Sequence, residues 1–172
     1  VVVHDGQHGD TTVGSADEEA AEAVAALMND ADIDTEIVDD PVANIWNKAF
    51  IAVGVKPIAA LTHLTDGEIL EFEDSRAVMD GIVEEAAAVA NAKGVENLVD
   101  DPVAYVHDFC EANSEHVSSA LEDVLNERRT ELEHLNGYLV AAGEELGVET
   151  PYNELIMRLV RSRERAYEDG SR

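Results

Sequence analysis

The order of hydrophobic and polar positions predicts a short β/α segment followed by a long series of helices. Three β-prone runs occur before residue 40, at residues 1–3, 11–13 and 35–38. Alanine-rich sequence with helical spacing fills residues 16–29, and Ser15 with Glu18 forms the signature of a capping box at its start. This β-β-α-β succession is too small for a domain, so we expect it to be the closing portion of a larger sheet.

After residue 40 the pattern predicts helices only. Asp40, Asp101 and Thr150 each stand before a proline, which is the arrangement of an N-cap followed by proline at the first helical position. Gly94 and Gly147 occupy expected C-terminal caps. Helical spacing indicates the residue ranges 41–55, 57–63, 67–72, 75–93, 101–113, 117–128, 130–146 and 151–168.

The predicted fold class is therefore mainly α. Residues 1–40 form a short β/α remnant, and residues 41–172 form an all-helical domain. A chain of 172 residues is long enough to bury a core without disulfides, and the single cysteine, Cys110, lies in a helical pattern that favours a buried apolar role over a nucleophile.

Charge narrows the classes of partner. The chain has 38 acidic residues against 11 Lys and Arg, a net charge of −27, which argues against nucleic acid because phosphates would be repelled. No apolar run is long enough to cross a membrane and no secretory signal opens the chain, so we expect a cytoplasmic protein. The acids are spread through the helices, and such a surface is typical of an organism living in concentrated salt, where screening removes self-repulsion.

The lysines stand out against this background. Only three occur, and two of them, Lys48 and Lys56, lie with Ala52 on one stripe of the helix that begins at residue 41. A helical lysine is ordinarily a solvated surface residue, and a functional cation is the alternative.

Other candidate groups carry weaker signals. His4 and His8 share no face in a strand and turn, so no metal site is predicted there. Arg158, Arg161 and Arg165 form one basic face of the last helix. They either meet a phosphate or, as we favour, pair with the helix dipole and with nearby acids such as Glu154 and Glu168.

An ordered set of segments resembles the C-terminal helical domain of the ketopantoate reductases (2-dehydropantoate 2-reductases). These segments are IWNKAFIAVGVKPIAALT, TDGEIL, EEAAAVANAKGV, SSALEDVLNERRTELEHLNG and AAGEELGVETPYNELIMRLV. The resemblance covers nearly the whole chain, and residues 1–40 resemble the end of that family's Rossmann domain. It implies an NAD(P)H-dependent enzyme that reduces the keto group of a 2-oxo acid, ketopantoate, in pantothenate and coenzyme A synthesis.

The resemblance also implies roles for residues. Lys48 matches the family's general acid, which protonates the developing alkoxide. Ser119 matches a serine that holds the substrate carboxylate, with a plain helix cap as the alternative. Glu131 matches a glutamate that positions both substrate and cofactor, with a capping-box acid as the alternative.

Four substrate-framing positions depart from the family pattern of asparagines. They are Ala52, Lys56, Asp66 and His116. Loss of an amide partner weakens binding of the group it held. A different 2-oxo acid is therefore an alternative substrate, for example a more anionic one met by Lys56, although Lys56 may equally be a solvated lysine.

Partners and cofactor follow from the same resemblance. NADP or NAD would be bound mainly by the first Rossmann half, which this chain lacks, so the isolated fragment is expected to be inactive. A homodimer is a further partner hypothesis. The rival function is a non-catalytic helical domain for dimerisation or scaffolding, and the four departures support it.

Overall fold

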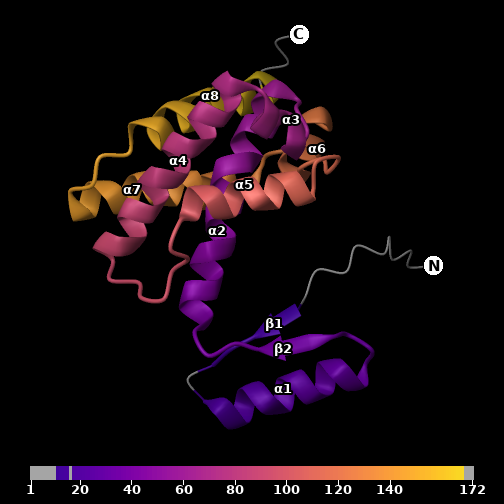
Figure 1. Ribbon diagram of the computed structural model, residues 1–172. Helices are drawn as coiled ribbons and strands as arrows, with labels where there is room; N and C mark the ends of the chain where they lie inside the picture. The colour runs from indigo at the N-terminus through magenta and orange to yellow at the C-terminus, as the bar shows by residue number, and fades with distance from the viewer. Residues whose placement is uncertain (1–10, 16, 169–172) are drawn as a thin grey trace. The chain divides into compact units, whose positions relative to one another are not determined.

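The computed structural model describes residues 11–15 and 17–168, and it confirms the mainly α class (Figure 1). The elements are β1 (Thr11–Val13), α1 (Glu18–Asp30), β2 (Thr35–Ile37), α2 (Pro41–Thr62), α3 (Asp66–Glu71), α4 (Glu73–Ala92), α5 (Pro102–Ala112), α6 (Ser119–Leu125), the 3-10 helix η1 (Glu131–His134), α7 (Asn136–Leu146) and α8 (Pro151–Glu168). These residues form two compact units that divide between Ile45 and Trp46, inside α2. Among them, no helix has the length and apolar character needed to span a membrane.

The first unit is a β-α-β arrangement. β1 and β2 pair in parallel, with Thr11 opposite Thr35 and Val13 opposite Ile37, and α1 connects them. The expected strand at residues 1–3 lies outside the described residues. The predicted capping box at Ser15 is wrong, because Asp17 is the N-cap and accepts a hydrogen bond from the Ala20 N–H. The Ser15 hydroxyl instead accepts from the Asp17 N–H.

In the second unit, α2 runs without a break through Pro57, so the predicted separation of helices 41–55 and 57–63 is wrong. Proline has no N–H, and within a helix it leaves the carbonyl four residues earlier without its donor. That carbonyl belongs to Val53, and it accepts a 2.9 Å hydrogen bond from the buried side-chain amide of Asn136 on α7. The side chain of a neighbouring helix therefore supplies the hydrogen-bond donor that Pro57 cannot provide.

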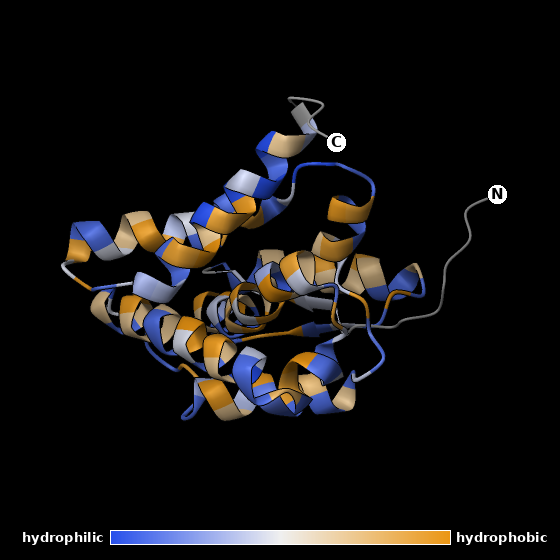
Figure 2. Ribbon diagram, turned by 90° about the horizontal axis from the view of Figure 1, so that it is seen from above, coloured by the Kyte–Doolittle hydropathy of each residue, from blue (hydrophilic) through white to orange (hydrophobic). Residues whose placement is uncertain are grey.

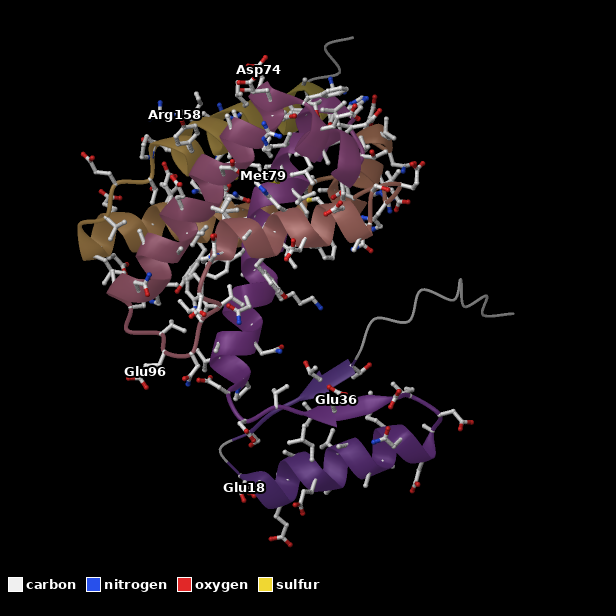
Figure 3. All side chains as sticks on the ribbon, viewed as in Figure 1. Glu18, Glu36, Asp74, Met79, Glu96 and Arg158 are labelled. Carbon is white, nitrogen blue, oxygen red and sulfur yellow. The ribbon has the colours of Figure 1, made fainter. Side chains whose placement is uncertain are left out.

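The core of this unit surrounds α4. Met79, Ile82 and Val83 of α4 are fully buried, and Figure 3 shows Met79 inside the helical unit while Asp74 and Arg158 lie at its edge. Apolar and hydrophilic residues alternate along the helices (Figure 2), as expected for helices with one apolar and one polar face. Gly54 permits close approach of α2 and α4, since a Cβ there would lie 2.8 Å from a Val83 methyl carbon.

Several predicted caps are confirmed. The carboxylates of Asp40 and Asp101 accept hydrogen bonds of 3.0 Å from the N–H groups of Ala43 and Ala104, respectively. Gly147 ends α7 with φ of 71°, in the left-handed region that suits glycine.

The predicted helix over residues 130–146 is divided into η1 and α7, which is a third correction. The Thr130 hydroxyl accepts from the Leu132 N–H, as an N-cap does. The sequence Thr130–Glu133 also has the signature of a capping box, but its reciprocal half is missing. Glu133 bonds Arg161, and the Thr130 N–H donates to Glu164 instead. Contacts to α8 therefore replace the local bonds that would start a longer helix.

Candidate functional site

A pocket of about 300 Å³ lies in the helical unit, and it collects five of the six side chains predicted for the site. Its lining residues are Lys48, Ile51, Ala52, Val55, Lys56, Asp66, Phe109, His116, Ser118 and Ser119. Glu131, the sixth predicted residue, is outside this lining but is bonded to Lys56. Among the described residues, no group of three or more His, Cys, Asp or Glu side chains is arranged to hold a metal ion.

One stripe of α2 supplies a wall of the pocket. Lys48, Ala52 and Lys56 recur every four residues and all face it, as the spacing predicts. Lys48 is exposed and has no ion-pair partner among the described residues. Its ammonium group is therefore available to a bound anion.

Lys56 is already paired. Its Nζ lies 2.5 Å from Oε1 of Glu131, and the two side chains are 29% and 40% exposed. Partial burial alone would raise the pKa of Glu131, but the hydrogen bond and charge of Lys56, together with a backbone hydrogen bond, hold that pKa below its usual value. Glu131 is thus ionised at neutral pH and meets the charge of Lys56.

This pair changes the interpretation of both residues. Glu131 is not the acid of a capping box, because its carboxylate reaches across to α2. The Glu131 carboxylate lowers the attraction of Lys56 for a second anionic group on a substrate, since it neutralises the ammonium. Support for a more anionic substrate is correspondingly weaker.

Asp66 and His116 approach each other because of local structure at the start of α3. Thr65 and Glu68 form a capping box that fixes Asp66 in the first turn. The Asp66 N–H donates to the His116 carbonyl at 3.2 Å. Gly67 lets the chain pass close by, since a Cβ there would lie 2.7 Å from the Cβ of Ser114. The turn before α6 is therefore held against α3.

The Asp66 carboxyl is buried and only half satisfied. Its Oδ2 lies 2.8 Å from Nδ1 of His116, while Oδ1 is buried with no hydrogen-bond partner among the described residues. Burial raises the pKa of Asp66, and the hydrogen bond and charge of His116 only partly oppose this. Burial, and then the charge of Asp66, also raise the pKa of the Cys110 thiol to about 12. Cys110 is fully buried, which confirms its predicted apolar role.

The buried Asp66 carboxylate is expected to cost stability at neutral pH. A pKa raised on folding stabilises the fold below the ordinary carboxyl pKa, and this contribution is lost as pH rises through the folded-state pKa. Asp66→Asn keeps an acceptor for His116 without the charge. We expect it to raise the thermal unfolding midpoint at pH 7 by roughly 2–4 °C, and the gain should shrink toward pH 4.

Asp80→Asn is the matched control for this prediction. Asp80 pairs with His107 at 2.6 Å, but both side chains are 30% exposed, so removal of the charge relieves little burial. Calorimetry of both variants between pH 4 and pH 7 makes the comparison. Equal changes in the two variants at all pH values would contradict the assigned burial cost.

Two adjacent serines have different positions at the start of α6. Ser118 is buried and is the N-cap, since its hydroxyl accepts from the Ala120 N–H. Ser119 begins the helix, is exposed and lines the pocket, and its hydroxyl has no partner among the described residues. The alternative of a plain cap therefore applies to Ser118, and Ser119 stays free for a ligand.

Some lining residues were absent from the predicted site. Ile51 and Val55 could have been predicted from the sequence, because on the same helix they lie next to the stripe formed by Lys48, Ala52 and Lys56. Phe109 and Ser118 carried no signal in the sequence. Of the predicted basic face on α8, Arg158 pairs with Glu154 as favoured, whereas Arg161 pairs with Glu133 of η1.

Residues 40–164 match the family model described as ketopantoate reductase PanE/ApbA C terminal. The chain belongs to this family. The match includes every residue of the pocket described above, so the family assignment and the pocket concern the same part of the molecule.

Relatives of the ketopantoate reductase family extend this match. The 2-dehydropantoate 2-reductase of Streptococcus pyogenes is 33% identical over 150 residues, which are 87% of this chain and 49% of that protein. The Archaeoglobus fulgidus enzyme of the same name is 33% identical over 163 residues, or 93% and 54%. A crystal structure of a PanE/ApbA family ketopantoate reductase from Ralstonia eutropha matches with a TM-score of 0.86 and 29% identity, covering 95% of this chain and 54% of that one. The chain therefore spans about half the length of these relatives.

Proposed function

We propose that this chain is the substrate-binding, C-terminal half of an NAD(P)H-dependent reductase that converts a 2-oxo acid to a 2-hydroxy acid. Ketopantoate, the precursor of pantoate in pantothenate and coenzyme A synthesis, is the preferred substrate. Residues 1–40 are assigned to the end of the Rossmann domain and residues 41–172 to the substrate domain. One observation carries the proposal: Lys48, unpaired among the described residues, faces Ser119 and the Asp66–His116 pair in one pocket of a family member.

The proposed roles follow from charge and position. Lys48 stabilises negative charge on the carbonyl oxygen and then donates its proton, because an ammonium beside that oxygen is both a cation and an acid. Ser119 donates a hydrogen bond to the substrate carboxylate. Asp66 and His116 contact the remainder of the substrate. The ion pair of Lys56 and Glu131 lies at one side of the site, and we call this pair the charged edge of the pocket.

The cofactor, NADP or NAD, supplies the hydride when bound. Most of its binding residues are expected in the first half of the Rossmann domain. Among the described residues Glu131 fits a contact with a hydroxyl or amide donor, since its carboxylate is ionised and 40% exposed. Residues in that first half of the Rossmann domain are expected to determine whether NADP or NAD is bound.

Two other functions retain support. The departures at Ala52, Lys56, Asp66 and His116 favour a different 2-oxo acid. Of these four residues, only Ala52 has no side-chain group that can form a hydrogen bond. A non-catalytic dimerisation or scaffold domain is the second alternative. The unpaired Lys48 and the free Ser119 hydroxyl weigh against it, because neither has a structural task among the described residues.

The proposal is tested by oxidation of NADPH and NADH in the complete reductase, with ketopantoate and then other 2-oxo acids. We also propose a salt-adapted, cytoplasmic enzyme that associates as a homodimer, and the net charge of −27 supports the salt adaptation. Activity and the thermal unfolding midpoint should therefore be higher in molar KCl than in dilute buffer. Turnover with another acid alone would favour changed specificity. A folded protein inactive with every acid would favour the scaffold.

A further inference from the structure

Two side chains one turn apart on α8 hold η1 from both of its ends. Oε1 of Glu164 accepts from the N–H and the hydroxyl of Thr130, at 2.9 and 2.8 Å. Arg161 donates to both carboxylate oxygens of Glu133, at 2.8 and 2.6 Å. Thr130 and Glu133 flank Glu131, so the glutamate lies on a turn that is fixed before and after it.

The opposite side of the turn is fixed by the core. Leu132, the residue after Glu131, is fully buried. With Leu132 in the core and both flanks bound to α8, the turn leaves Glu131 directed to Lys56 at 2.5 Å. This contact joins residues 75 positions apart, so it depends on how the turn packs in the fold. The backbone hydrogen bond to the Glu131 carboxylate is local and does not bring it to α2.

We propose that Arg161 and Glu164 are positioning residues that hold Glu131 against Lys56 and thereby set the charged edge of the pocket. Neither side chain lines the pocket. Their effect passes through Thr130 and Glu133 to the turn, and from the turn to the Lys56 ammonium. The catalytic meaning of this assignment rests on the proposed function, but the assignment itself concerns a contact that is measurable without turnover.

The geometry distinguishes this arrangement from ordinary surface ion pairs. A single exposed pair contributes little, and Arg158 with Glu154 is such a pair, four residues apart on one helix with both side chains at least half exposed. Arg161 and Glu133 are also exposed, at 43% and 55%, but their contact is two-pronged and joins two different elements. The hydrogen bond of Arg161 to Glu133 lowers the pKa of that carboxyl. The same hydrogen bond and the charges of Glu133 and Glu164 raise the pKa of Arg161. The two α8 residues therefore act on η1 together.

The lysine content of the chain provides a direct assay. Lys48, Lys56 and Lys93 are the only lysines, so an amine-acylating reagent followed by mass spectrometry reports on each one separately. Lys48 and Lys93 are exposed and act as internal references, whereas Lys56 is 29% exposed and paired with Glu131, so we expect it to react more slowly. In the whole chain, Arg161→Ala and Glu164→Ala are each expected to raise the acylation rate of Lys56 about three- to fivefold, as expected for loss of one partly exposed ion pair.

Matched variants separate positioning from general loosening. Glu164→Gln keeps an oxygen for Thr130 and should restore protection of Lys56, while Arg158→Ala should leave all three rates unchanged. Glu133→Gln weakens the same contact from η1 without altering α8, and it replaces Arg161→Ala should that variant fail to fold. Folding is checked by circular dichroism and by protection of the buried Cys110 thiol.

Two outcomes would overturn the assignment. One is unchanged Lys56 reactivity in folded Arg161→Ala and Glu164→Ala, and the other is an equal rise at all three lysines. In an active complete reductase, the same two variants should also lower kcat/KM severalfold, whereas Arg158→Ala should not. Absence of reductase activity would refute the proposed function but would leave the lysine result interpretable.

Discussion

Lys48→Ala should lower kcat of the complete reductase by about 10²–10⁴-fold, the usual contribution of a well-placed general acid. Lys48 faces the pocket without an ion-pair partner among the described residues, so its proton and charge are available to the substrate oxygen. Alanine supplies neither. Affinity for the dinucleotide should change little, because we expect its binding site mainly in the other half of the enzyme.

The measurement is steady-state oxidation of NADPH or NADH, with cofactor binding determined separately by fluorescence. Lys93→Ala is the control, since Lys93 is an exposed lysine outside the pocket that stands over the ring of Tyr138. Its turnover should match that of the unaltered enzyme. Comparable losses in both variants, or no loss in Lys48→Ala, would remove the general-acid assignment.

Ser119→Ala should mainly raise KM for the 2-oxo acid, by about 10- to 100-fold. A hydrogen bond to a charged group contributes roughly 1.5–3 kcal/mol, and the proposed bond from Ser119 to the substrate carboxylate would be present in the ground state as well as the transition state. The Ser119 hydroxyl lines the pocket and makes no other hydrogen bond among the described residues. Its removal should therefore leave kcat and the fold nearly unchanged.

Ser118→Ala provides the neighbouring control. Ser118 caps α6, and loss of a cap costs about 1 kcal/mol of stability. We expect a lower unfolding midpoint with a much smaller rise in KM. Substrate titrations and thermal unfolding of both variants test this division of roles. A KM increase in Ser118→Ala equal to that in Ser119→Ala would show that the helix end, and not the Ser119 hydroxyl, is what matters.

Local signals predicted most of the fold. Caps at Asp40 and Asp101 and the glycine at Gly147 mark helix ends through bonds to near neighbours, and such bonds are readable in sequence. The error at Ser15 was local, since the neighbouring Asp17 is the N-cap. The other two errors arose where a distant residue changed a local outcome. Pro57 lies inside a helix because of Asn136, and the turn at Glu131 stays separate from α7 because α8 binds its ends.

The candidate site also has features that local sequence predicts and features that depend on distant residues. The spacing of Lys48, Ala52 and Lys56 on one helix was enough to predict one shared face. The pairing of Asp66 with His116, 50 residues apart, and of Lys56 with Glu131 depends on tertiary packing, for which periodicity gives no information. The resemblance to a family pointed to these four residues as site residues, but it did not predict the two pairs that they form.

The hydrogen bond from Asn136 to the Val53 carbonyl has an evolutionary consequence. Pro57 depends on Asn136, because a proline inside the helix leaves the buried Val53 carbonyl without a donor unless the Asn136 amide bonds it. Asn136 also donates to Asn153, so it keeps a partner of its own. Loss of Asn136 would strand a buried carbonyl, and loss of Pro57 would restore a backbone donor that competes for the same oxygen. Lineages that lose Asn136 are therefore expected to lose Pro57 as well, whereas loss of Pro57 alone should be tolerated.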